Sequence, residues 1–226
     1  MTTCIVVNKS RHITSSEVVR VCSAVNKWSK GVSQVWDVPQ VILLPGSLPQ
    51  GTGSTASFGV ILLQDGLDVA GAAGYHDVYG GRPIGKVDIS GTIDAGMSWS
   101  VTLCHELAEM MVDPWCFSSS QYARDSWIAL EVGDPVEDDR FGMQIDGVLC
   151  SDYVLPAYFA GGSGPYDAMR LLKSPAPALL PGGYASVCVN GNWSQISPPG
   201  EQLAPRGVNS RRHELRVALS DQIVGV

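Results

Sequence analysis

Apolar and polar residues near the start of the chain form a strand pattern followed by a helix pattern. Residues 3–7 read TCIVV, a β-branched run that predicts a strand. Thr14 and Glu17 have the spacing of a capping box, which predicts the start of a helix. Apolar residues then recur at helical spacing as far as Trp28, so one face of this helix is expected to be buried. Gly31, which follows a lysine, predicts the end of the helix.

Three segments after this helix have the composition of strands. Residues 38–44 and 58–63 are strongly apolar, and residues 85–90 alternate between apolar and polar. A fourth segment, residues 69–75, reads VAGAAGY and is rich in glycine. Glycines in such a segment indicate that the backbone approaches another part of the chain closely, so we expect a tight contact there. His76 follows directly, and we expect it at a strand end.

A second amphipathic helix is predicted over residues 98–112. Ser98 or Ser100 can serve as its N-cap. Asp113 stands before a proline, a position at which helices usually end. The apolar positions of this segment gather on one side of the helix, which we expect to face the core.

The pattern weakens after the second helix. Short strands are predicted over residues 141–145 and 148–154. Residues 174–206 are rich in proline and glycine and show little periodicity, and residues 212–217 form a candidate last strand. Strands and helices that follow one another in this order predict an α+β fold.

The composition suits a protein with a substantial core. The chain has 226 residues, of which 45% are hydrophobic and only 16% are charged, so a largely disordered chain is not expected. We expect one α+β domain over residues 1–160, which carries the helix at about 98–112. Residues 161–226 are expected to form a Pro/Gly-rich extension that packs on this domain or on a partner.

The charge of the chain excludes some classes of partner. A net charge of −7 and a pI near 5.0 argue against nucleic-acid binding, which needs a basic surface. No stretch has the ~18 apolar residues of a membrane helix, and no secretory signal is visible, so we expect cytosolic synthesis. The six cysteines lack C-x-x-C spacing and are expected to be buried thiols. One basic cluster near the C-terminus is interpreted as a solvated face or a contact with an acidic partner: Arg206, Arg211, Arg212 and Arg216.

The second helix carries a group of side chains that can bind a metal ion. Residues 104–115 read CHELAEMMVDPW. Positions i and i+4 of a helix share a face, so His105 and Glu109 project side by side, and Asp113 extends the row. An imidazole and a carboxylate on one face can both bind a divalent metal. Glu106 is rotated by about 100° from His105, a position from which it can act as a general base.

A metal site needs at least one further ligand from elsewhere in the chain. Glu131 lies in the segment EVGDPVEDD, late enough for the chain to fold back over the helix, and His76 is an alternative ligand. Asp134 is expected to accept the remaining ring N–H of a ligating histidine. A metal held in this way would polarise a substrate carbonyl, and Glu106 would accept a proton from the attacking water.

The same residues also allow a simpler interpretation. A histidine and two acids on a helix are most often a solvated polar face, and His76 alone is more often a hydrogen-bonded structural residue. The acidic run at 137–139 is more often a turn. However, charged residues are scarce in this chain, yet acids concentrate on the second helix and in residues 131–139.

The order of elements up to the second helix resembles the N-terminal subdomain of the zincin-like metallopeptidase superfamily. This resemblance implies a twisted mixed sheet with two main helices, and an edge strand that aligns a peptide substrate. Over residues 58–160 the chain is also similar to uncharacterised phage and bacterial proteins with a His-Glu-x-x-Glu-x-x-x-Asp-Pro segment. The residues that carry this similarity read GAAGYHD, SVTLCHELAEMMVDPW, EVGDPVEDD and IDGVLCSDYVLPAYF.

The resemblance implies that His105 is a metal ligand and that Glu106 is the base of a variant H-E-x-x-E motif. Glu109 stands where the family has its second histidine. Zn²⁺ is the metal that the resemblance favours, whereas the extra carboxylate makes the site harder and more suited to Mn²⁺, Ca²⁺ or Mg²⁺. The replacement is also what a scaffold without catalytic activity would show.

Two functions are therefore expected as alternatives. The first is a metal-dependent hydrolase of peptide bonds, with a peptide or protein as its substrate. The second is a structural protein of a phage virion, such as a capsid decoration or tail component, built on an inactive scaffold. In that case the chain would pack against copies of itself or against virion neighbours. Neither a nucleic acid nor a membrane is expected as a partner, and the chain is expected in the cytoplasm on synthesis and, in the second case, in the virion.

Overall fold

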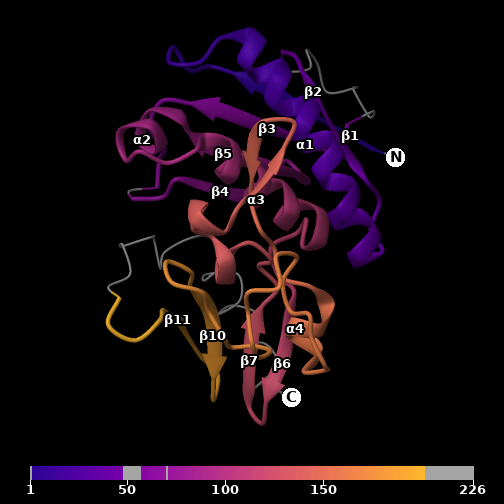
Figure 1. Ribbon diagram of the computed structural model, residues 1–226, viewed down its shortest axis with the longest axis vertical. Coiled ribbons are helices and arrows are strands. Elements are labelled where there is room, and N and C mark those ends of the chain that lie inside the picture. The colour runs from indigo at the N-terminus through magenta and orange to yellow at the C-terminus, as the bar shows by residue number, and fades with distance from the viewer. Residues whose placement is uncertain (1, 48–56, 70, 202–226) are drawn as a thin grey trace.

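The computed structural model describes residues 2–47, 57–69 and 71–201, which form an α+β fold with a mixed sheet. Figure 1 shows an upper part with β1–β5 and α1–α3, and a lower part with β6, β7, β10, β11 and α4. The elements in chain order are β1 (Thr2–Asn8), α1 (Ser15–Trp36), β2 (Val41–Pro45), β3 (Gly59–Gln64), β4 (Gly74–Tyr79), β5 (Arg82–Asp88), α2 (Ile89–Asp94), α3 (Trp99–Val112), β6 (Ser119–Ala123), β7 (Ser126–Ala129), the 3₁₀ turns η1 (Asp134–Val136) and η2 (Asp139–Phe141), β8 (Met143–Ile145), β9 (Val148–Cys150), α4 (Pro156–Ala160), β10 (Ala185–Val189) and β11 (Asn192–Ile196).

The upper part is built on a five-stranded sheet with the order β2-β1-β3-β5-β4. The first four of these strands are parallel, whereas β4 runs antiparallel to β5 and forms an edge. Gly80 and Gly81 join β4 to β5 with φ values of 58° and 75°. Two consecutive residues with positive φ fit a tight hairpin turn. His76 pairs with Gly85 and therefore lies inside β4, not at a strand end as the sequence analysis expected.

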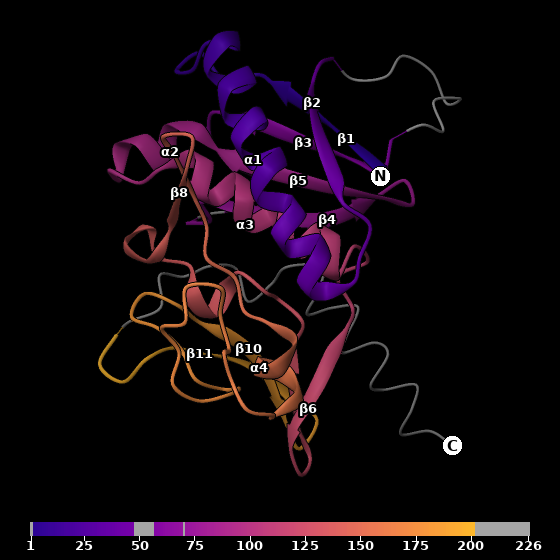
Figure 2. The ribbon, with the colours of Figure 1, turned by 45° about the vertical axis from the view of Figure 1, so that its right-hand side comes forward.

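Helices α1 and α3 pack against this sheet and against each other, as the two views in Figures 1 and 2 show. The predicted strand at 3–7 is part of β1, and the predicted capping box is present. The Glu17 amide donates to Thr14 Oγ1 over 3.2 Å, and the Thr14 amide donates to Glu17 Oε2 over 2.7 Å. The apolar face of α1 includes Trp28, whose indole nitrogen donates to the Ser151 carbonyl.

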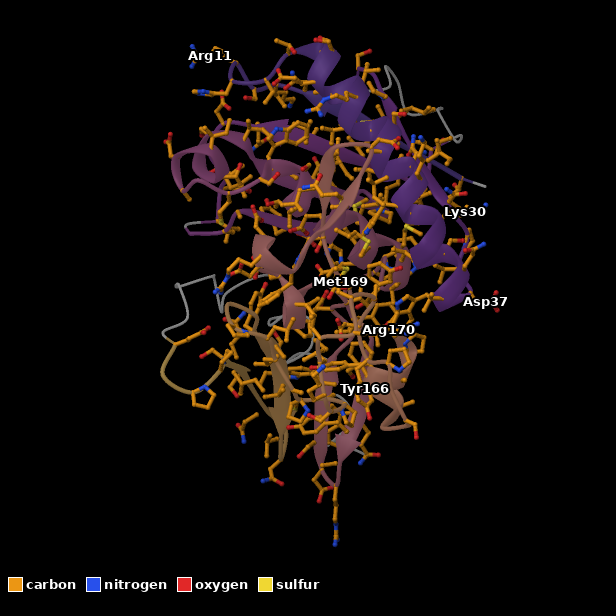
Figure 3. All side chains as sticks on the ribbon, viewed as in Figure 1. Arg11, Lys30, Asp37, Tyr166, Met169 and Arg170 are labelled. Carbon is orange, nitrogen blue, oxygen red and sulfur yellow. The ribbon has the colours of Figure 1, made fainter. Side chains whose placement is uncertain are left out.

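The predicted end of α1 at Gly31 is wrong. The helix continues to Trp36 and ends at Asp37, which takes a left-handed conformation with φ 51°. Val32 is fully buried, so the apolar face of the helix extends past the glycine. Burial of that face offsets the roughly 1 kcal/mol that a glycine costs inside a helix. Figure 3 labels Lys30 and Asp37 along this last stretch of α1.

The lower part contains a four-stranded antiparallel sheet that the sequence analysis did not predict. Its order is β11-β10-β7-β6, so strands from residues 119–129 pair with strands from residues 185–196. Two of these strands read SSQYA and NWSQI, and they carry too few apolar residues to give a clear alternating pattern. The predicted strand at 212–217 and the arginine cluster of residues 206–216 lie outside the described residues.

The segment between α4 and β10 is irregular, yet its backbone is tied to its surroundings. The Leu155 amide donates to the Tyr166 carbonyl over 2.7 Å, and the Ala168 amide donates to the Tyr153 carbonyl over 3.0 Å. Figure 3 places Tyr166 on the lower part of the molecule, with Arg170 and then Met169 above it towards the upper part. The chain after residue 160 therefore packs directly against earlier residues.

The hairpin of β8 and β9 packs against α1 and α3. It corresponds to the strands predicted at 141–145 and 148–154, although both are shorter than predicted. All six cysteines are buried thiols without a disulfide among the described residues, which confirms the expectation from their spacing. In the described part of the chain, no helix combines the length and apolar character needed to cross a bilayer.

Candidate metal centre

The side chains of the H-E-x-x-E motif are buried. His105, Glu106 and Glu109 expose only 5%, 3% and 2% of their surface. The alternative expectation of a solvated polar face is therefore wrong for this helix. Helix α3 is enclosed by β4 and β5, by β9 and by the chain that follows β7. Buried polar side chains of this kind require partners, because an unpaired buried charge is strongly destabilising.

His105, Glu109 and Asp134 form the first of two groups that can hold a metal ion. Nε2 of His105 lies 3.2 Å from Oε1 of Glu109 and 3.2 Å from Oδ1 of Asp134. His105 and Glu109 share one face of α3, as their spacing predicts. Asp134 comes from η1, so a segment distant in sequence completes the group.

The chain after β7 fixes the place of Asp134. The Gly133 amide points to Oε1 of Glu109 at 3.4 Å, and the Tyr184 amide donates to the Asp134 carbonyl over 3.0 Å. Gly133 lies so close to His105 that a side chain at that position would collide with the imidazole ring. The sequence analysis expected Asp134 to accept the second ring N–H of a ligating histidine. Instead, it faces the same ring nitrogen as Glu109, so the two carboxylates and this nitrogen form one group that could hold a metal.

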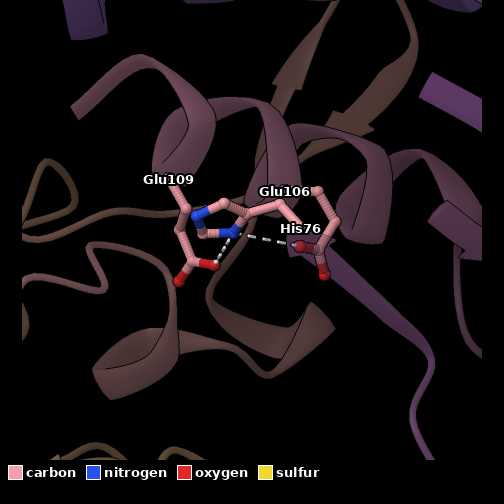
Figure 4. A group of neighbouring side chains, drawn as sticks. All are labelled: His76, Glu106 and Glu109. Atoms are coloured by element: carbon pink, nitrogen blue, oxygen red, sulfur yellow. Dashed lines mark hydrogen bonds and ion pairs between the residues drawn. The ribbon is translucent and has the colours of Figure 1, made fainter. Parts of the chain in front are cut away.

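His76, Glu106 and Glu109 form the second group. Nδ1 of His76 lies 3.1 Å from Oε2 of Glu109 and 3.6 Å from Oε2 of Glu106. Figure 4 shows the two carboxylates on either side of this ring nitrogen. The group depends on close packing of β4 on α3, because a Cβ at Gly74 would lie 2.6 Å from both Glu106 Oε1 and Thr102 Cγ2. The tight backbone contact expected for the glycine-rich segment is therefore present.

The other two candidate ligands from the sequence lie outside both groups. The carboxylate of Asp113 accepts hydrogen bonds from the Ser118 amide and hydroxyl and from the Phe117 amide, so it shapes the turn after α3. Its backbone carbonyl lies 3.3 Å from Nε2 of His76 and orients that ring. Glu131 is 4% exposed and, within the described part of the chain, belongs to neither group.

Burial and mutual interaction shift the pKa values of the ionisable side chains in this motif. Burial raises the pKa of Asp134 to about 8, and the Glu109 carboxylate adds to that rise. Burial also raises the pKa of Glu106, although the two imidazoles oppose the rise. Burial disfavours the charged forms of His105 and Glu109, but their mutual attraction prevails. The pKa of His105 is therefore raised well above its usual value, and that of Glu109 is lowered well below.

The residues present fit a divalent metal. Two donors bound tetrahedrally to zinc at about 2.0–2.1 Å lie about 3.3 Å apart. Nε2 of His105 is 3.2 Å from each of the two carboxylate oxygens of the first group, which is close to that value. Within the described chain, the ion pairs of Glu106, Glu109 and Asp134 are with the two histidines only. Three carboxyl groups thus face two imidazoles in a buried site, and together they form a donor set that could hold a divalent cation once their protons are displaced.

A small pocket reaches the motif from the surface. Its cavity volume is about 30 Å³, which exceeds the ~10–15 Å³ that one water needs. His105 and Glu106 line it together with Gly74, the first residue of edge strand β4, and Ala73, which precedes that strand. The other lining residues are Met97, Val101, Thr102, Glu137, Asp139 and Tyr184. The sequence analysis did not identify Tyr184, because that residue comes from the segment that was expected to be irregular.

Comparison of this chain with protein-family models, with curated proteins and with solved structures finds no match.

Proposed function

We propose that this protein is a metal-dependent hydrolase with a zincin-like active site, and that its substrate is a peptide or protein. The observation that carries the proposal is the convergence of His105, Glu109 and Asp134 beside a pocket that Glu106 also lines. Such a donor set can hold Zn²⁺, and its two carboxylates also suit Mn²⁺. A divalent metal held there would supply Lewis-acid activation of a substrate carbonyl and of water.

The residues of this chain would perform three tasks in that reaction. Glu106 would accept the proton of the attacking water, a role for which its raised pKa brings it nearer to neutrality. Gly133 and the η1 turn would hold the imidazole of His105 and the carboxylate of Asp134 in place. The pocket would admit water and the scissile group while the buried surroundings exclude bulk solvent.

The position of β4 supports a peptide as the substrate. This strand is last in the sheet order, and its first residue, Gly74, lines the pocket beside Glu106. An extended peptide can pair with such an edge strand through backbone hydrogen bonds. In this arrangement, pairing would bring a peptide carbonyl toward the motif without the need for a deep binding cleft.

The proposal is tested with the full chain in three steps. First, metal content is measured by mass spectrometry after purification and again after chelation and dialysis against Zn²⁺ or Mn²⁺. Second, hydrolysis of a pool of fluorogenic peptides is compared between chelated and reloaded protein. Third, Glu106→Gln is compared with Asp125→Asn, a change of the same kind at an exposed turn.

We expect at least one tightly bound metal per chain and activity that chelation removes and reloading restores. Glu106→Gln should lower the rate by at least ~10²-fold, as expected for loss of a general base, while Asp125→Asn should leave it unchanged. The absence of bound metal, or full activity in Glu106→Gln, contradicts the proposal.

A second candidate function is structural, and the depth of burial favours it. The donor residues come from β4, α3 and η1, and each exposes 5% or less of its surface. A metal in this position would join the upper sheet to the lower part and stabilise the fold. The chain would then serve as an assembly subunit, such as a phage virion component, in which the metal has no catalytic role.

Stability and mass measurements separate the two functions. A structural metal should raise the melting temperature strongly on loading, and an assembly subunit should form oligomers in light scattering after size exclusion. A monomer that hydrolyses peptides in a metal-dependent way supports the hydrolase. A metal-stabilised oligomer without any hydrolytic activity supports the structural role.

A further inference from the structure

The carboxylate of Glu109 lies between two histidines. Its Oε1 atom is 3.2 Å from Nε2 of His105, and its Oε2 atom is 3.1 Å from Nδ1 of His76. The two candidate groups of metal ligands therefore share this one side chain. A carboxylate that presents one oxygen to each of two sets of donors has the arrangement of a bridging ligand.

The hydrogen bond of His76 to the Asp113 carbonyl determines which ring nitrogen carries the lone pair that faces Glu106 and Glu109. Nε2 of His76 is 3.3 Å from the carbonyl oxygen of Asp113. A carbonyl can only accept, so Nε2 must carry the hydrogen of this bond. In the neutral ring, Nδ1 then has a lone pair that faces the oxygens of Glu106 and Glu109. Three electron-rich atoms can face one another in a buried site only if a proton or a metal ion lies between them.

Glu106 provides a second, independent observation. Its side chain is nine-tenths or more buried, and its Oε2 atom has no hydrogen-bond donor among the described residues. Figure 4 shows this carboxylate directed at the His76 ring. A buried carboxylate oxygen without a donor is costly. Coordination of a cation would satisfy it together with the lone pair of His76.

We infer that His76, Glu106 and Glu109 hold a second divalent cation, with Glu109 bridging it to the cation held by His105 and Asp134. The spacing fits this site as it fits the first. Nδ1 of His76 lies 3.1 Å and 3.6 Å from its two carboxylate partners, close to the roughly 3.3 Å expected for neighbouring ligands of one metal. The ligand set of one imidazole and two carboxylates suits Zn²⁺ or Mn²⁺.

A metal bound at the second site would inhibit hydrolysis, and this step rests on the proposed hydrolase function. Glu106 serves as the base in that reaction, and it is also a ligand of the second cation. A carboxylate that coordinates a cation cannot at the same time accept a proton from water. The first equivalent of metal should therefore activate the protein, and the second should inhibit it.

The test counts metal ions and asks whether they are coupled. Chelated full-length protein is dialysed against Zn²⁺, and bound zinc is counted by mass spectrometry. A parallel sample is loaded with Mn²⁺ and examined by electron paramagnetic resonance, in which two carboxylate-bridged Mn²⁺ ions give a coupled spectrum. The variants are His76→Gln for the second site and Asp134→Asn for the first, with Asp125→Asn as the matched control.

We expect two equivalents and a coupled spectrum for the original protein and for Asp125→Asn. His76→Gln should bind one equivalent and lose the coupling, and Asp134→Asn should also fall to one. If His76→Gln does not fold by circular dichroism, Glu106→Gln provides the same comparison. Any hydrolysis should rise with the first equivalent and fall with the second, and the fall should be absent in His76→Gln.

The outcomes separate the two proposals. One equivalent in the original protein, unchanged in His76→Gln, overturns the second site but leaves the first intact. That outcome would mean that a proton, and not a metal, lies between His76 and the two carboxylates. Two equivalents in both proteins exclude His76 as a ligand. No bound metal in any sample overturns both proposals.

Discussion

Gly133 lies directly against the imidazole ring of His105. A Cβ built on Gly133 would be 2.5 Å from Nδ1 and 2.7 Å from Cγ of that ring. Real Cβ atoms essentially never approach another atom so closely. The backbone at Gly133 therefore packs against the imidazole ring and restricts the orientation of His105 toward Glu109 and Asp134.

The first prediction concerns this contact between the Gly133 backbone and the His105 ring. Gly133→Ala should displace the ring of His105 and weaken metal binding by about 10–100-fold, the usual effect of disturbing the groups that orient a metal ligand. Affinity is measured by competition with a chelator. Gly162→Ala is the matched control, because a Cβ at Gly162 meets no atom within 4 Å. Equal metal affinity of the two variants would show that the contact has no role in orienting His105.

The second prediction concerns a buried pair of carboxyl groups in the lower part. Asp152 and Asp167 expose 1% and 0% of their surface. Burial, and then the hydrogen bond with Asp167, raises the pKa of Asp152 to about 8. The unfolded chain releases this proton near pH 4. Between about pH 4 and pH 8 the folded state therefore binds more protons, and its stability should fall as pH rises, by up to about 1.4 kcal/mol per pH unit.

Asp152→Asn should remove this contribution, because an amide resembles the protonated acid. The variant should match the original protein near pH 4 and be more stable near pH 8. Urea unfolding at several pH values, with Asp125→Asn as the control, provides the measurement. A difference between variant and original that does not change with pH would contradict the assigned protonation.

The third prediction compares two positions on α1. Trp28 is 3% exposed, and its ring meets that of Tyr153 edge-on with centroids 5.5 Å apart. Trp28→Ala should lower the free energy of unfolding by about 3–5 kcal/mol, as for other large core truncations. Val19 lies on the same helix but is 56% exposed, so Val19→Ala should change stability by less than about 0.5 kcal/mol. Similar losses in the two variants would refute the packing of α1 described above.

The fourth prediction concerns the thiols. Burial raises the pKa of Cys22 to about 12 and that of Cys4 still further. Thiolates are the reactive form, and all six cysteines are buried. The folded protein should therefore react with less than about one equivalent of a thiol reagent at pH 8, and the unfolded protein with six. Rapid modification of several thiols under native conditions would be incompatible with this core.

The sequence predicted the elements whose signals are local. The capping box of Thr14 and Glu17 and the apolar spacing on α1 and α3 depend only on neighbouring residues. The sheet of the lower part could not be predicted in this way. Ile128 pairs with Val187 across a long stretch of chain, so these strands are stabilised by pairing and not by their own composition.

The candidate site was predicted in part. His105 and Glu109 were placed together because a helix fixes the positions of i and i+4. His76 reaches Glu109 only because β4 pairs with β5 in one register, and a slip of one residue would turn its ring to the other face. The ring nitrogen that Asp134 faces likewise depends on the path of the chain through Gly133. Neither feature has a signal in the local sequence.

Backbone hydrogen bonds join the turn at Asp134 to the segment before β10, and they have a consequence for biosynthesis. The Tyr184 amide donates a hydrogen bond to the Asp134 carbonyl, and the Leu180 amide donates one to the Pro135 carbonyl. A ribosome releases these two amides only when nearly all of the described chain has been made, long after the motif helix has emerged. A nascent or truncated chain that ends before residue 180 would contain His105 and Glu109. It would lack the two hydrogen bonds that position Asp134. In such a fragment a metal held by His105 and Glu109 would lack the Asp134 ligand, so the proposed site would be complete only after residue 184 has been made.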